Sequence, residues 1–201
     1  MTFGIYPIVE GHGEVLSLPL VLRRILSEVY GIYDFVCFYP HRLPRGKMSD
    51  PEELGKAVEL GVRRVQGVGS QGGVLVLLDA DDDCPVEVAS VISEIGENRA
   101  GGRCLFQVTV ANREFEAWFL SAILSLRGVR GVKSDAEPPH SPEAIRGAKE
   151  FLRRELMVTS ATYSPTVDQA ALASNFDLCA AAKARSFEII VKVTGELAGV
   201  E

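Results

Sequence analysis

Short apolar segments alternate with segments of helical spacing through the first part of the chain. Apolar runs that are rich in β-branched and aromatic residues predict strands at 3–9, 33–39, 73–79 and 104–110. Apolar residues recur at helical spacing between these strands and predict helices over 15–30, 51–66 and 85–98. Strands that alternate with helices of this length predict an α/β fold with a largely parallel sheet covered on both faces.

Two prolines indicate where a helix begins and where the first strand lies in the sheet. Asp50 and Pro51 stand where a capping residue and the first helical position are expected, so they mark the start of the helix over 51–66. Pro7 lies inside the first strand, where it cannot donate a ladder hydrogen bond, and this favours an edge position or a bulge there.

The pattern changes near residue 126. A stretch rich in Gly, Pro and charge is followed by helical spacing over 142–156, 167–174 and 176–192, and strand alternation does not return. We therefore expect an α/β domain over 1–125 and a helical extension over 126–201 that packs on it.

Composition restricts the class of protein. The 201 residues are 47% hydrophobic, which is enough for one globular core. The longest apolar run is far below the ~20 residues that span a bilayer, so we expect a cytoplasmic protein without a membrane segment. The four cysteines form no CxxC pair and have no histidine at ligand spacing, which argues against a zinc site or a disulfide framework.

Negative charge is concentrated at the front of the chain. Residues 1–125 hold 17 Asp and Glu against 11 Lys and Arg, and this difference accounts for the whole net charge of −6. A protein of this charge is a poor nonspecific binder of nucleic acid. Bound divalent cations would change that locally.

Three acidic groups follow predicted strands: Glu10 with Glu14, Asp79 with Asp81 to Asp83, and Glu114 with Glu116. Functional groups of parallel sheets collect at the carboxyl ends of the strands, so these groups are candidates for one site. Asp79 and Asp81 could together bind a hard cation, and oxygen ligands suit Mg²⁺ or Mn²⁺. Glu10 ends a buried run, where a carboxylate is costly unless it is paired or metal-bound.

Several of these acids also have structural explanations. Glu14 and Glu116 would each lie in the first turn of a helix, where the helix dipole favours an acid. Asp82 and Asp83 fit a solvated turn that caps the helix beginning at Pro85.

Basic residues provide candidate phosphate contacts. Arg42, Arg45 and Lys47 lie in a predicted loop after the second strand, at the same end of the sheet, and Arg185 precedes a C-terminal helix. The alternatives are a solvated basic loop and an ordinary charged helix surface.

The ordered motifs resemble a known family. "VEGHGExxxLPxVL" followed by a strand that ends in "DAD" resembles the Toprim domain of OLD-family nucleases, and "FEAWFL", "YSPTVDQ" and "ARSFE" resemble the DUF4276 family. The resemblance implies catalytic roles for Glu10 and Glu14. It also implies Mg²⁺ ligation by Glu10, Asp79 and Asp81, with Glu116 as a further candidate ligand.

The resemblance implies a Mg²⁺-dependent nuclease or phosphodiester-transfer protein that acts on nucleic acid, DNA rather than RNA, in bacterial defence or DNA processing. OLD nucleases carry an ATPase domain that this sequence lacks, so a separately encoded ATPase partner is expected. The alternative is a catalytically silent, metal-binding interaction subunit, which the net charge of −6 favours.

Overall fold

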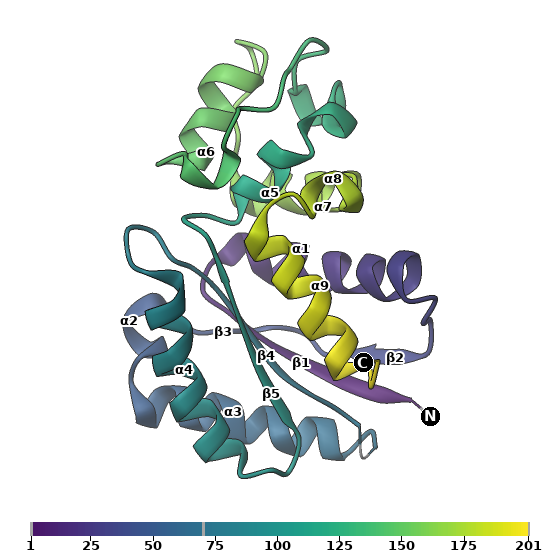
Figure 1. The fold of residues 1–201 in the computed structure, drawn as a ribbon, viewed down its shortest axis with the longest axis vertical. Helices are drawn as coiled ribbons and strands as arrows, with labels where there is room; N and C mark the ends of the chain where they lie inside the picture. Colours follow the sequence, from purple (N-terminus) through teal and green to yellow (C-terminus); the bar gives the residue numbers. More distant parts are fainter. Residues whose placement is uncertain (1, 70, 201) are drawn as a thin grey trace.

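A computed structural model of the protein describes residues 2–69 and 71–200. Its centre is a five-stranded parallel sheet with the order β2-β1-β4-β5, in which β3 pairs with β1 (Figure 1). The strands are β1 (Phe3–Val9), β2 (Phe35–Cys37), β3 (His41–Arg42), β4 (Gly72–Asp79) and β5 (Leu105–Ala111).

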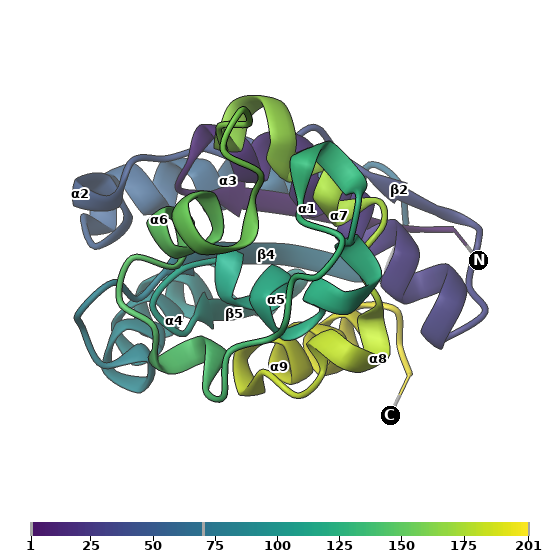
Figure 2. The same cartoon turned by 90° about the horizontal axis from the view of Figure 1, so that it is seen from above.

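Helices cover both faces of this sheet (Figures 1 and 2). One face packs on α3 (Pro51–Gln66) and α4 (Pro85–Ala100), and the other packs on α1 (His12–Arg24) and α9 (Arg185–Leu197). Alternation along β4 explains the two layers, since Val74 and Val76 belong to one buried cluster and Leu75 and Leu77 to the other. The predicted α/β fold is confirmed.

Short helices gather beyond the carboxyl ends of the strands (Figure 1). They comprise α5 (Glu116–Ser121), α6 (Ala148–Phe151), α7 (Ala170–Ala173) and α8 (Leu178–Ala181). Single 3₁₀ or π turns join or extend the helices at Ile25–Val29, Ile123–Leu126, Val129–Gly131, Pro142–Ala144, Leu152–Leu156 and Pro165–Gln169. A fifth short helix, α2 (Arg45–Met48), precedes α3.

Most predicted elements are found, with errors where the elements are short. The helix over 51–66 has its predicted bounds, and Asp50 caps it by accepting hydrogen bonds from the backbone N–H groups of Glu52 and Glu53 at 2.8 and 3.2 Å. The loop expected at 40–47 contains β3 and α2. The helix expected at 176–192 is two helices, and that at 142–156 is a series of single turns. Elements of two to five residues leave too little periodicity to detect.

The prediction that Pro7 marks an edge position or a bulge is wrong. β1 is an internal strand, and Pro7 pairs in register with Leu75 of β4. On the other side, the carbonyl groups of Ile5 and Val9 accept hydrogen bonds from Phe38 and Leu43, which lie just after β2 and β3. Pro7 is midway between them and faces the break between these two short strands, so its missing N–H leaves no ladder position unfilled.

The C-terminal segment packs on the core. Helix α9 lies along β5, and Leu197 at its end approaches Gly73 of β4 so closely that an added Cβ there would lie 2.7 Å from its Cδ2. Trp118, Phe176 and Phe187 join the short helices to the same buried cluster. Each helix within the described residues is too short or too polar to cross a membrane.

Candidate active site

A cleft of about 400 Å³ opens at the carboxyl ends of the neighbouring strands β1 and β4. Its acidic side chains are Glu10 and Glu14 from the β1–α1 turn and Asp79 and Asp81 from the end of β4. The opposite wall consists of Lys149 from α6 and residues 164–166, at the start of the turn Pro165–Gln169. The structure therefore brings together the acids of two distant turns.

Local geometry explains how Glu14 reaches the cleft. Gly11 is the N-cap of α1, and a Cβ at this position would overlap the Glu14 carboxylate, which folds back over it. A side chain at position 11 would displace the Glu14 carboxylate, so glycine leaves room for this orientation of Glu14. Val9, the last residue of β1, is in register with Leu77, so Glu10 lies one residue beyond this pair and Asp79, the last residue of β4, lies two residues beyond it.

Asp79 is a partly buried acid at the end of β4. Its Oδ1 accepts a hydrogen bond of 2.8 Å from the backbone N–H of Phe115. Burial, followed by the negative charges of Glu116 and Glu14, raises the pKa of Asp79 well above its usual value. Ionisation of Asp79 in the folded protein therefore costs free energy, and a cation bound nearby would reduce this cost.

Glu10 has a cationic neighbour, Arg45. Its Oε2 lies 3.5 Å from Arg45 Nη1, an ion-pair contact without hydrogen-bond geometry, and this oxygen has no hydrogen-bond partner among the described residues. Burial raises the pKa of Glu10 although Arg45 opposes the shift. Arg45 also donates to the carbonyl oxygen of Asp79 and pairs with Asp83 at 2.7 Å. It is fixed at the rim of the cleft.

Glu116 lies behind the cleft and does not line it. Its side chain is buried, Oε1 accepts a 2.8 Å hydrogen bond from the Tyr163 hydroxyl, and Oε2 has no partner in the part of the chain described. Burial raises the pKa of Glu116 to about 7, although the charge of Lys149 opposes the shift. Burial alone would lower the pKa of Lys149, but Glu116 and Asp79 outweigh it and raise that pKa.

Asp81 is held by an unusual backbone conformation. Its φ of 51° is left-handed, and its N–H donates to the carbonyl oxygen of Arg113, whose φ of 64° is also left-handed. Asp tolerates this region better than most residues, yet it remains sparsely populated. The turn therefore places Asp81 in the cleft at some conformational cost.

The acids line one cleft, but their spacing is not that of metal ligands. Across residues 2–69 and 71–200, no group of three or more His, Cys, Asp or Glu side chains is spaced to hold a metal ion. The donor type suits Mg²⁺ or Mn²⁺, and among the residues that the structure describes Glu10 and Glu116 each have an oxygen without a hydrogen-bond partner. The chemistry of the donors fits a divalent cation, but their present separations would have to shrink around it.

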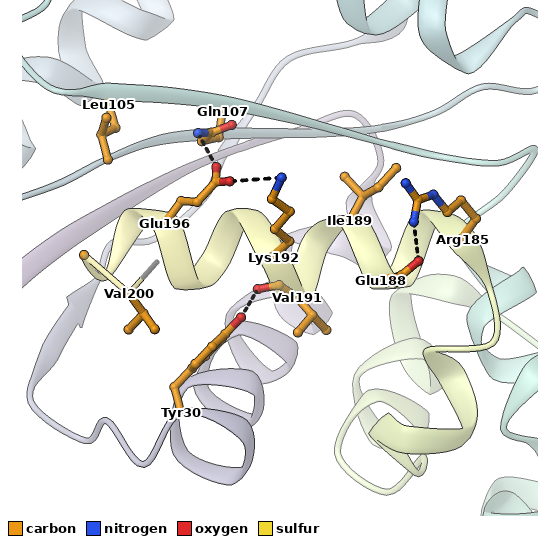
Figure 3. Close-up of a pocket in the computed structure, with 11 residues that line it drawn as sticks. Tyr30, Leu105, Gln107, Arg185, Glu188, Ile189, Val191, Lys192, Glu196 and Val200 are labelled. Carbon is orange, nitrogen blue, oxygen red and sulfur yellow. Dashed lines mark hydrogen bonds and ion pairs between the residues drawn. The ribbon is translucent and has the colours of Figure 1, made fainter.

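Of the four predicted phosphate contacts, Arg45 pairs with the cleft acid Glu10, and the other three lie elsewhere. Lys47 pairs with Glu53 at 2.7 Å. Arg185 pairs with Glu188 and lines a separate groove of about 820 Å³ between α9 and β5 (Figure 3). Arg42 is an exposed residue of β3 outside the cleft lining.

The turn of Asp82 and Asp83 forms ion pairs instead of a helix cap. Asp82 pairs with Arg113 and Arg146 at 3.1 and 2.6 Å, and Asp83 pairs with Arg45. Cys84 is the N-cap of α4, and within the described part no side chain caps this helix.

Sequence reasoning assigned no role to Lys149, Tyr163 or Gln169. Buried Gln169 donates to Glu14 Oε1 and Glu116 Oε1 at 3.2 and 3.5 Å. Tyr163 and Gln169 begin and end "YSPTVDQ", so the resemblance marked this stretch without indicating what it does. Lys149 had no signal, because an isolated lysine in a charged helix resembles any surface lysine.

Comparison with known proteins identifies the family. The model of the domain of unknown function DUF4276 matches residues 9–192. This chain belongs to the DUF4276 family. Both cleft turns and the "YSPTVDQ" stretch lie within the matched range, so the acidic cleft of this DUF4276 protein is built from family sequence.

The comparisons with solved structures and with curated proteins do not identify a function. Among solved structures, the DUF4276 chain is similar to the C-terminal region of the OLD protein of Xanthomonas campestris pv. campestris, with a TM-score of 0.46, 14% sequence identity and 96% of each chain covered. No match was found among curated proteins.

A pair of glycine substitutions tests the packing of the cleft. Glycine to alanine inside a helix normally stabilises by up to about 1 kcal/mol, and we expect this sign for Gly55→Ala, where an added Cβ meets nothing closer than 3.8 Å. At Gly13, a Cβ would overlap Gln169 Oε1 and lie 2.9 Å from Pro165 Cβ, so Gly13→Ala should destabilise by about 1–3 kcal/mol. Urea denaturation measures both, and equal stabilisation by the two variants would contradict the close packing of Gln169 on α1.

Proposed function

We propose that this DUF4276 protein is a Toprim-type nuclease that depends on Mg²⁺ or Mn²⁺ and cleaves phosphodiester bonds in nucleic acid, DNA rather than RNA. The observation that carries the proposal is the convergence of Glu10, Glu14, Asp79 and Asp81 on one cleft at the ends of β1 and β4. Ionised carboxylates that face one another at the end of a strand are destabilised by burial and by mutual repulsion, and a bound metal ion removes this destabilisation.

Electrostatics supports a cation in this cleft. The pKa values of Asp79 and Glu10 are raised by burial and by neighbouring carboxylates, and Glu10 Oε2 has no hydrogen-bond partner among described residues. Glu10, Asp79 and Asp81 would hold the ion, with Glu116 behind them, after their side chains rotate toward it. A bound Mg²⁺ would supply the positive charge that stabilises the transition state of phosphodiester cleavage.

The remaining residues have separate roles in the proposal. Glu10 or Glu14 would accept the proton of the attacking water, a role that suits a carboxylate whose pKa is raised, as that of Glu10 is. Lys149 and Arg45 would contact phosphate oxygens, since both are cations at the cleft or its rim. A separately encoded ATPase would engage the substrate.

The test is cleavage by the purified protein. Linear, nicked and supercoiled DNA and RNA are incubated with Mg²⁺ or Mn²⁺, and cleavage should fall at least about 100-fold in Asp79→Asn and Glu10→Gln, the scale of losing a key electrostatic contact. Lys47→Gln is a control for the loss of one charge outside the cleft, because Lys47 pairs with Glu53. Cleavage that is equal in all variants would remove the site.

A second function is favoured by the net charge of −6, which is unfavourable for an enzyme that binds DNA. This second function is a catalytically silent subunit that binds a metal and a protein partner. Mn²⁺ binding without cleavage of any substrate, even with the partner recovered from the native host, would favour this function.

A further inference from the structure

Gln169 lies between two carboxylates that other elements deliver. Its side chain is buried, and its Nε2 donates to Glu14 of α1 at 3.2 Å and to Glu116 of α5 at 3.5 Å. An amide nitrogen carries two protons, so it can serve two carboxylates at once. Gln169 is therefore a neutral bridge between two groups of the same charge.

The orientation of this amide is fixed from its other end. Gln169 Oε1 lies 3.2 Å from the Ser17 hydroxyl, which has one proton to share between this oxygen and the Gly13 carbonyl oxygen at 3.1 Å. Only the nitrogen end of the amide can donate to the two acids, and the Ser17 contact keeps that end directed at them. Gly13 leaves the space that the amide occupies.

The segment that carries Gln169 is anchored independently. The preceding residue, Asp168, is buried and accepts hydrogen bonds from the Arg130 side chain at 2.6 and 2.9 Å and from the Ser164 backbone N–H at 2.8 Å. Tyr163 donates to Glu116 at 2.8 Å. Residues 163–169 thus contact the acids at both ends, and their middle forms a wall of the cleft.

We propose that Gln169 is the positioning residue of the acidic cleft: it holds the Glu14 and Glu116 carboxylates in the arrangement in which the acids of the cleft bind a divalent cation. The inference rests on the proposed function and adds a residue that has no place in the predicted ligand set. A buried amide is costly unless its hydrogen bonds are made, so a space-filling role alone would be served better by leucine.

The test compares Gln169→Leu with Gln107→Leu by titrating Mn²⁺ into each metal-free protein and measuring affinity by calorimetry. Gln107 is the matched control because its Nε2 also donates to a glutamate, Glu196, at 2.8 Å, on the β5–α9 surface away from the cleft. Residues that orient metal ligands typically contribute 10–100-fold to metal affinity, so Gln169→Leu should weaken Mn²⁺ binding by about this factor. Gln107→Leu should bind as the wild type does.

Ser17→Ala is the second variant, for the case in which Gln169→Leu does not fold. It removes only the hydroxyl that orients the amide, from a helix in which alanine is favourable, and Mn²⁺ affinity should fall several-fold. A structural role alone would lower the melting temperature of the metal-free protein without changing the affinity of its folded fraction.

The outcomes separate the two proposals. Wild-type affinity in folded Gln169→Leu, or an equal loss in Gln107→Leu, overturns the positioning role and leaves the proposed function standing. If Gln169→Leu does not fold, unchanged affinity in Ser17→Ala overturns the positioning role. A wild-type protein that binds no Mn²⁺ refutes the proposed function, and the positioning role falls with it.

Discussion

Asp79→Asn is expected to raise the melting temperature of the metal-free protein at pH 8 and to leave it nearly unchanged at pH 4. The carboxylate is buried beside Glu116 and Glu14, which raises its pKa well above the usual value. Asparagine keeps the oxygen that accepts the hydrogen bond from the Phe115 N–H and removes the charge. A residue central to the proposed activity is thus expected to limit stability, a common trade-off.

The sign of the pH dependence follows from the raised pKa. A carboxyl group whose pKa is higher in the folded state contributes stability that is complete below its unfolded pKa of about 3.9 and is lost as the pH rises through the folded value. Glu10 and Glu116 are shifted in the same direction, the latter to about 7. Stability of the metal-free wild type should therefore decline between about pH 4 and pH 8 where these groups dominate.

The difference in melting temperature between Asp79→Asn and the wild type excludes the contributions of other titrating groups. Burial lowers the pKa of His41, which adds stability as the pH rises through its range, but His41 is present in both proteins and cancels in the difference. For a chain of this size, each 1 kcal/mol gained should raise the melting temperature by about 2–4 °C.

Melting curves at pH 4, 6 and 8, with and without 5–10 mM Mg²⁺ (roughly saturating for a weak site), provide the measurement. Mg²⁺ should stabilise the wild type at pH 8 and have no effect on Asp79→Asn, because a ligand stabilises only the state that binds it. A lower melting temperature for Asp79→Asn at pH 8 would show that the Asp79 charge is compensated in the folded protein.

The long elements and the acids at their ends could be predicted because their signals are local. β4 is a continuous apolar run that ends at Asp79, and the Asp50–Pro51 pair marks the start of α3. Parallel strands then bring Glu10 and Asp79 to the same edge of the sheet with no further information.

The supporting residues of the cleft could not be predicted in this way. Gln169 meets Glu14 across 155 positions of sequence, from a π turn five residues long. No periodicity extends over such a turn, and nothing local distinguishes a glutamine that bridges two acids from one that faces solvent. Arg185 failed for the opposite reason, since its sequence neighbourhood suggested a site while the fold placed it on the outer surface of α9.

Trp118→Ala is expected to cost about 3–5 kcal/mol of unfolding free energy, the usual range for removing a fully buried aromatic side chain. Trp118 is fully buried, and its ring lies 4.5 Å from Phe115 and 5.2 Å from Phe187, between centroids. Its indole N–H donates to Ser186 Oγ at 2.8 Å. This side chain therefore joins α5, which carries Glu116, to α9.

Two substitutions separate packing from hydrogen bonding and from aromatic loss in general. Trp118→Phe keeps most of the ring contacts and removes the donor, so the lost hydrogen bond should cost about 0.5–1.5 kcal/mol. Tyr33→Ala removes an aromatic ring that is 78% exposed and should change stability by less than about 0.5 kcal/mol. Trp118 is the single tryptophan, so urea denaturation must be followed by circular dichroism instead of fluorescence.

The number of unfolding transitions of Trp118→Ala distinguishes two ways in which the C-terminal segment could contribute to stability. If α9 and the sheet form one cooperative unit, they unfold together, and a loss of packing free energy in one part destabilises the whole unit. The variant should then unfold in one transition at lower urea, since about 3–5 kcal/mol is a large part of a domain's typical ~5–15 kcal/mol of stability. If the short helices are only attached to a core that is stable alone, an early transition should appear and the sheet should unfold at the wild-type midpoint. The shared buried cluster of Trp118, Phe187 and Leu77 predicts the single transition.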